Sequence, residues 1–170
     1  MDEAELIKKY FKKLSSKSKN SLNLKDDVYF DKKKNLAVPV EPLIEGIHFL
    51  NFKQPKLVIK KIIRSSISDL YAKGVKPKSY FISASGNKKN FSKKNLLSIT
   101  NSLDEEQKRY NIFLGGGDTV FSNKLSFTIT SIGYAKDIIY RNKATFDDDI
   151  YVSGNLGDSY AGLLALNNKI

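Results

Sequence analysis

The spacing of apolar residues along the chain predicts three helices, two of them long. The clearest covers residues 57–72, where apolar side chains recur every three or four positions until Gly74 and Pro77 end the pattern. A second long helix is predicted over residues 93–110. A short helix over residues 4–14 has apolar residues on one side and lysines on the other, which predicts an amphipathic element.

Between these helices, alternation of apolar and polar residues predicts several strands. The predicted strands are 28–30, 36–40, 79–85, 112–114, 125–135 and 150–153. Strands mixed with two substantial helices indicate an α+β fold. We expect a mixed or mainly antiparallel sheet with both long helices packed on one face.

The same pattern divides the chain into three parts. Residues 1–20 form an amino-terminal helix and a polar linker, residues 21–136 form the α+β domain, and residues 137–170 form a connection followed by the start of a second domain. A glycine-containing segment near residue 157 opens a further helix, after which little chain remains for it to pack against. We therefore expect the chain to stop just inside that second domain.

Composition narrows the class of protein. The chain has 170 residues, 41% of them hydrophobic, which suffices for one domain with a core. No apolar run is long enough to span a bilayer, no signal-peptide pattern begins the chain, and there is no cysteine, so we expect a cytoplasmic protein without a membrane partner. The net charge of +11 comes mostly from scattered lysines, which favours a solvated surface over a nucleic-acid partner.

Acidic residues follow or precede several apolar segments. They are Asp26, Asp27, Glu41, Asp69 and Asp118. If they meet in space, their mutual repulsion requires a cation, and hard oxygen ligands of this kind suit Mg²⁺. Taken singly, each has a simpler explanation as part of a polar turn or as a solvent-facing helix residue. The chain lacks the usual nucleophiles, because it has no cysteine and a single histidine.

Three further features leave both a functional and a structural explanation open. Residues 115–117 are consecutive glycines before Asp118, and they could present N–H groups to phosphate or form a tight turn. His48 could contact a ligand or be a hydrogen-bonded core imidazole. Arg141 could bind an anion or be an ordinary surface charge.

Five segments, in order along the chain, resemble the thiamine-monophosphate kinase family, which lies in a larger group with aminoimidazole ribonucleotide synthetase. The most specific are Glu-Gly-Ile-His-Phe at 45–49, Ser-Asp-Leu at 68–70 and Gly-Gly-Asp-Thr at 116–119. Residues 25–27 and 152–163 also match family segments. The resemblance implies the amino-terminal domain of an aminoimidazole ribonucleotide synthetase-like fold, with a homodimer whose sheets pair into a barrel.

The resemblance also implies an activity, which is Mg²⁺-assisted in-line transfer of a phosphoryl group from ATP to thiamine monophosphate, giving thiamine diphosphate. By resemblance, Asp27, Glu41, Asp69 and Asp118 would hold the metal ions within an ATP- and Mg²⁺-binding domain at 21–136. No protein nucleophile is expected, because positioning and charge neutralisation account for most of the catalysis of phosphoryl transfer.

Four residues would contact the organic ligands in such an enzyme. By resemblance, Gly117, Asp118 and Arg141 would bind ATP, and His48 would touch the thiamine substrate. The partners expected are therefore ATP and thiamine monophosphate.

The chain departs from the family pattern at positions near the expected metal ligands. Lys25 stands in place of a glycine, Glu41 in place of an aspartate and Lys73 in place of a methionine. Family members are also much longer than this chain, so we expect these residues alone to turn over slowly or not at all. Two alternatives remain, namely a nucleotide-binding domain without catalysis, and a related ATP-using enzyme acting on another small molecule.

Overall fold

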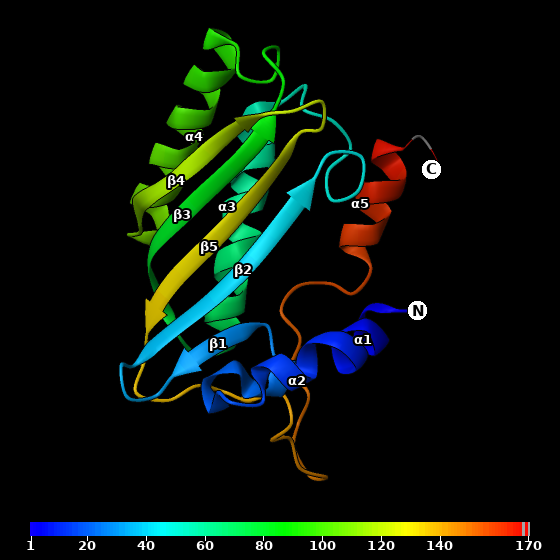
Figure 1. The fold of residues 1–170 in the computed structure, drawn as a ribbon. Coiled ribbons are helices and arrows are strands. Elements are labelled where there is room, and N and C mark those ends of the chain that lie inside the picture. The colour runs from blue at the N-terminus through cyan, green and yellow to red at the C-terminus, as the bar shows by residue number, and fades with distance from the viewer. Residues whose placement is uncertain (168, 170) are drawn as a thin grey trace.

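The computed structural model describes residues 1–167 and residue 169, and it contains a five-stranded sheet with helices against one face (Figure 1). The strands are β1 (Val28–Asp31), β2 (Leu36–Ile44), β3 (Lys76–Gly86), β4 (Phe113–Phe121) and β5 (Ser126–Tyr134). The helices are α1 (Glu3–Leu6), α2 (Lys12–Ser15), α3 (Pro55–Ala72), α4 (Lys93–Tyr110) and α5 (Asp158–Leu166). A π-helical turn (Ile7–Phe11) joins α1 to α2, and a 3₁₀ segment (Lys19–Leu24) precedes β1.

The strand order is β1-β2-β5-β3-β4, and every neighbouring pair is antiparallel except β3 with β4. Helices α3 and α4 both lie behind the sheet in Figure 1, and its front face carries no helix. The prediction of an α+β fold with a mixed sheet and two helices on one face is confirmed. This architecture arises because successive side chains of a strand point to opposite faces of the sheet. One face packs on the helices and the other does not.

The core lies between α3 and the central strands. Ile59, Ile62 and Ile63 of α3 are almost fully buried, and they meet Phe127 and Ile129 on the helix-facing side of β5. Each such side chain stabilises the fold by about 2 kcal/mol through removal of apolar surface from water. Helix α3 is therefore held rigidly against the sheet, and its last turn is carried to a defined position beside β1 and β2.

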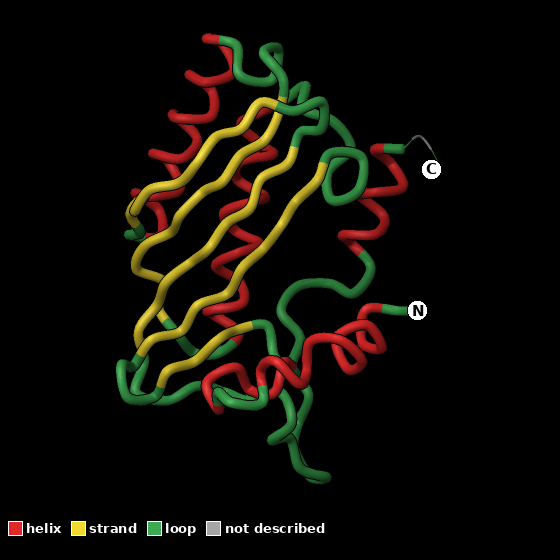
Figure 2. The backbone as a smooth tube through the Cα atoms, viewed as in Figure 1, coloured by secondary structure: helices red, strands yellow, loops and turns green. Residues whose placement is uncertain are grey.

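Two predictions of secondary structure need correction. Residues 150–153 do not form a strand but belong to the long loop between β5 and α5 (Figure 2). The amino-terminal helix spans the predicted residues, but no residue of α1 or α2 is buried, and Leu14 is 75% exposed. Its apolar side therefore does not pack into the core in this chain.

The second correction concerns the glycine run, which lies inside strand β4 and forms no turn. Gly116 has a φ of +146°, and Gly117 lies so close to the carbonyl oxygen of Ile82 that a Cβ atom would overlap it. The sequence pattern ended the strand at residue 114, because glycine normally weakens a strand. Here Gly117 is required by the close approach of two backbones.

Among the described residues, no helix is both long enough and apolar enough to cross a membrane.

Candidate functional site

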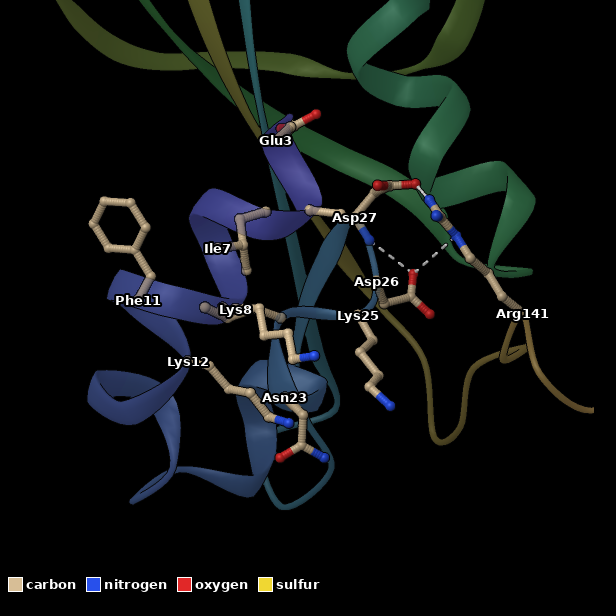
Figure 3. Close-up of a pocket in the computed structure, with 12 residues that line it drawn as sticks. Glu3, Ile7, Lys8, Phe11, Lys12, Asn23, Lys25, Asp26, Asp27 and Arg141 are labelled. Carbon is tan, nitrogen blue, oxygen red and sulfur yellow. Dashed lines mark hydrogen bonds and ion pairs between the residues drawn. The ribbon is translucent and has the colours of Figure 1, made fainter. Parts of the chain in front are cut away.

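An acidic cluster forms where four segments of the chain converge beside the last turn of α3. Asp26 and Asp27 directly precede β1, and Glu41 projects from β2 on the helix-facing side. Asp69 lies in the last turn of α3. Arg141 comes from the connection after β5 and reaches back to the aspartate pair (Figure 3). The pairing of β1 with β2 and the packing of α3 on β2 bring these side chains together.

Both members of the aspartate pair already have a cationic partner. Lys73 Nζ lies 2.6 Å from Asp26 Oδ1, and the two side chains are only 5% and 6% exposed. Arg141 forms an ion pair with Asp27, and its Nε lies 3.9 Å from Asp26 Oδ1. The chain itself therefore supplies two of the cations that this cluster needs.

The other two carboxyl groups have no cationic partner of their own. The pKa of Asp69 is raised to about 6, first by burial and then by a hydrogen bond with Glu41 and the negative charge of Glu41. Lys73 opposes this rise. Asp69 Oδ2 is buried and has no hydrogen-bond partner. An unpaired buried oxygen of this kind is costly, and a ligand or cation at this point would satisfy it.

The cluster fits a single hard cation better than a set of several. Asp27 and Asp69 line the same hollow, of about 180 Å³, which has room for an ion with its water. Within residues 1–167 and 169, no three acidic or histidine side chains are already gathered as a complete metal site. Mg²⁺ is commonly held by one or two carboxylates together with water and phosphate oxygens, so Asp69, with Glu41 beside it, would be the protein ligands of such an ion.

A cavity of about 950 Å³ opens on the other side of the aspartate pair. Figure 3 shows Lys8 and Lys12 of the amino-terminal helix on its wall, with Lys25 and Arg141 opposite them. These cations would suit an anionic ligand such as a phosphate chain. The sequence indicated only a solvated lysine face here, because nothing in the pattern showed that this helix turns back toward residue 26.

Gly117 and Asp118 lie far from this cluster within one chain. They belong to β4, at the opposite edge of the sheet from β1. The register pairs Asp118 with Ser83 on the helix-free face, where Asp118 is exposed and accepts a hydrogen bond from Thr119 N at 2.8 Å. Across the strands between the two edges, the separation is on the order of 15–20 Å. The structure thus brings together Asp27, Glu41, Asp69 and Arg141, but not Asp118.

His48 lies at a third place, in the loop between β2 and α3. It is exposed, so it is not a core imidazole, and its Nδ1 accepts a hydrogen bond from Ile44 N at 3.0 Å. It lines a hollow of about 360 Å³ with largely apolar walls, to which Phe49, Leu57 and Leu163 contribute. A flat apolar ring with a polar edge would fit such a hollow.

Sequence reasoning missed Asp26 and Lys73 as a pair. Asp26 was part of a recognised acidic doublet, but Lys73 stood out only as a departure from the family pattern at the end of an apolar helix. A lysine in line with the apolar stripe of a helix faces the core. Because lysine is almost never buried without a partner, such a position indicates a buried ion pair.

Comparison with known proteins identifies the class. A family model described as AIR synthase related protein, N-terminal domain, matches residues 25–135, and the chain belongs to this family. Within it, the chain is similar to thiamine-monophosphate kinases. That of Haemophilus influenzae is 36% identical over 169 residues, which cover 96% of this chain and 51% of the relative. The resemblance read from the sequence motifs is confirmed.

Solved structures agree with this assignment. The thiamine monophosphate kinase of Aquifex aeolicus superposes with a TM-score of 0.83 at 28% identity, covering 100% of this chain and 56% of that one. AaThiL complexed with AMPPCP and TMP superposes with a TM-score of 0.86 at 28% identity, covering 99% of this chain and 53% of that one. The chain spans about half the length of the curated relatives it matches.

Proposed function

We propose that the chain binds ATP with Mg²⁺ and contributes to phosphorylation of thiamine monophosphate to thiamine diphosphate. The observation that carries the proposal is the buried, unpartnered Asp69 Oδ2 beside Glu41, in a cluster with more carboxylates than cations. The similarity to thiamine-monophosphate kinases supports the choice of reaction, as does the match to a relative complexed with AMPPCP, an analogue of ATP, and TMP.

The site residues suit a phosphoryl transfer that needs no protein nucleophile. Mg²⁺, when bound, neutralises phosphate charge and orients the reacting groups. Asp69 and Glu41 would hold the ion, with Asp27 on the wall of the same hollow. Arg141 stands between that hollow and the larger lysine-lined cavity, where its guanidinium group would bind phosphate oxygens. The chain's own part is to position charged groups, which is the main requirement of this chemistry.

The distance between Arg141 and Asp118 bears on where ATP would bind. Since one chain holds these residues at opposite edges of the sheet, a single copy does not bring both to the same nucleotide. Apolar side chains are exposed on the helix-free face, among them Val40, Phe113 and Val120 at 55%, 53% and 57%. We infer that a second copy covers this face and supplies Asp118 to the nucleotide site, as expected for a homodimer.

His48 is the proposed contact for the thiamine part of the acceptor. The apolar hollow beside it also includes Leu163 of α5, so the segment at 47–61 and α5 contribute to one binding wall. His48→Ala should therefore weaken binding of thiamine monophosphate while leaving AMPPCP binding unchanged. Equal loss of both ligands would contradict this division.

Binding, not turnover, gives the test, because the relatives are about twice as long as this chain. We expect calorimetric titration with AMPPCP to show binding that requires Mg²⁺ and is lost in Asp69→Asn and Asp118→Asn. Asp104→Asn is the matched control, because Asp104 is an exposed acid of α4 that forms a surface ion pair with Lys108. Binding of equal strength without Mg²⁺, or unaffected by the first two substitutions, would overturn the proposal.

One observation favours a second candidate, a nucleotide-binding domain without catalysis. Lys73 and Arg141 already occupy Asp26 and Asp27, which leaves fewer free carboxylates than the family resemblance implies. The two candidates differ in the second ligand. Thiamine monophosphate that binds together with Mg²⁺ and AMPPCP supports the kinase, and its failure to bind supports the domain without catalysis.

A further inference from the structure

Lys73 is a buried cation at the centre of the acidic cluster. Its side chain is 5% exposed, and its Nζ lies 2.6 Å from Asp26 Oδ1, which is equally buried. Removing an ammonium group from water costs several kcal/mol unless a close opposite charge offsets it. The structure therefore ties the burial of Lys73 to the carboxylates around it.

The position of Lys73 in the fold fixes its ammonium group. Lys73 is the C-cap residue of α3, where the partial negative charge of the helix end favours a cation. Its carbonyl oxygen accepts a hydrogen bond from Ile139 N at 3.1 Å, so the backbone is tied to the connection that carries Arg141. If the ammonium group of Lys73 moved away, the buried carboxylate of Asp26 would lose its 2.6 Å partner and keep only Arg141, 3.9 Å away.

The charges in the cluster show what Lys73 changes. Four carboxyl groups, of Asp26, Asp27, Glu41 and Asp69, face two cations, Lys73 and Arg141. One divalent ion at Asp69 and Glu41 would neutralise the two negative charges that Lys73 and Arg141 leave unmatched. With an apolar side chain at position 73, Asp26 would be a buried carboxylate whose nearest cation is the guanidinium group of Arg141 at 3.9 Å, and it would be open to a further metal ion.

We propose that the ammonium group of Lys73 takes the place of a metal ion at Asp26. It prevents metal binding by Asp26 and so lowers by one the number of divalent ions that the cluster binds. The proposal rests on the proposed Mg²⁺ function and deepens it, since it names the residue that determines how many divalent ions the site binds.

The test is a count of bound metal on the full chain, made without nucleotide. Mn²⁺ is titrated into wild type, Lys73→Met and Lys25→Met, and free Mn²⁺ is measured by electron paramagnetic resonance. We expect Lys73→Met to bind one more Mn²⁺ per chain than wild type. Lys25→Met is the matched control, because it removes the same charge from an exposed position next to Asp26 and should leave the count unchanged.

The outcomes separate this proposal from the proposed function. If wild type binds Mn²⁺ and Lys73→Met binds the same number, the role of Lys73 is wrong and the metal-dependent function stands. If only Lys73→Met binds Mn²⁺, the role of Lys73 holds and the Mg²⁺ function of the natural chain fails. If neither protein binds Mn²⁺, or if Lys25→Met gains an ion as well, the proposal is overturned.

A second variant covers the case in which Lys73→Met does not fold. The double variant Asp26→Asn/Lys73→Met leaves no unpaired charge at the pair, and we expect it to bind as many Mn²⁺ ions as wild type. Loss of one ion in the double variant would show that Asp26 is a metal ligand despite Lys73, and it would overturn the proposal.

Discussion

Helix α3 carries two ion-pair sites that differ in how completely their charges are matched. In the middle of the helix, Arg64 binds Glu106 of α4 through two hydrogen bonds of 2.7 and 2.8 Å, and the Glu106 side chain is 2% exposed. At the end of the helix, Lys73 and Arg141 face four carboxyl groups, and Asp69 Oδ2 has no partner.

This difference distinguishes a structural ion pair from a site that binds a ligand. Arg64 and Glu106 satisfy each other, so nothing further is needed between α3 and α4. The cluster at Asp69 holds surplus negative charge in a partly buried place, which folding alone does not favour. Such an imbalance persists where an additional cation completes the site, and functional sites concentrate perturbed groups of this kind.

The largest expected effect is that of Lys73→Met on stability without divalent cations. Removing one partner of a buried pair should lower the free energy of unfolding by about 4 kcal/mol, because Asp26 remains buried beside other carboxylates. Urea denaturation in EDTA measures this loss. Addition of Mg²⁺ should restore a large part of it in the variant and raise the stability of wild type by less. A loss that Mg²⁺ does not reduce would contradict the charge-imbalance account.

Arg64→Ala should be nearly as destabilising but insensitive to Mg²⁺. It leaves Glu106 buried and unpaired, at an expected cost of about 3 kcal/mol in the free energy of unfolding. The double variant Arg64→Leu/Glu106→Leu should recover most of that loss, since no charge is then left behind. Glu105→Gln is the control, because Glu105 pairs with Lys56 and Lys60 at the surface and should matter little. Rescue of Arg64→Ala by Mg²⁺ would erase the contrast between the two sites.

A smaller effect, with a defined sign, concerns the pH dependence of stability in EDTA. The pKa of Asp69 is raised from 3.8 to about 6 in the folded chain, first by burial and then by Glu41. The stability that its proton contributes is complete below pH 4 and is lost as the pH rises through 6. Asp69→Asn should therefore match wild type near pH 4 and be more stable by about 1 kcal/mol above pH 7, after allowance for solvent screening. Melting temperatures between pH 4 and 8 would show this, and parallel curves for the two proteins would refute it.

Most of the fold followed from the sequence because its signals are local. The apolar stripe of α3 and the alternation in β5 state which side of each element faces the core. The order of the strands in the sheet and the parallel pairing of β3 with β4 are not local, and no periodicity encodes them. The path of β4 through Gly117 was missed for the same reason, since it depends on the carbonyl group of Ile82 in another strand.

The candidate site was predictable residue by residue but not as an arrangement. The family resemblance marked Asp27, Glu41 and Asp69, and the structure places them in or beside one cluster. It also marked Asp118, which lies across the sheet because three strands, β2, β5 and β3, separate β1 from β4. Composition gave no hint of the pair between Asp26 and Lys73, because their contact depends on how α3 ends against β1.

The spread of the cluster along the sequence has a consequence for how the chain folds. Its members stretch from Asp26 to Arg141, which covers nearly all of the region at 25–135 that the family model matches and continues beyond it. Closing so long a loop costs entropy that only the packed sheet and α3 can offset, so the charges meet late in folding. An unfolded chain offers a cation or nucleotide nothing comparable to bind. Ligand binding thus reports that the whole chain from β1 to the connection has reached its native arrangement.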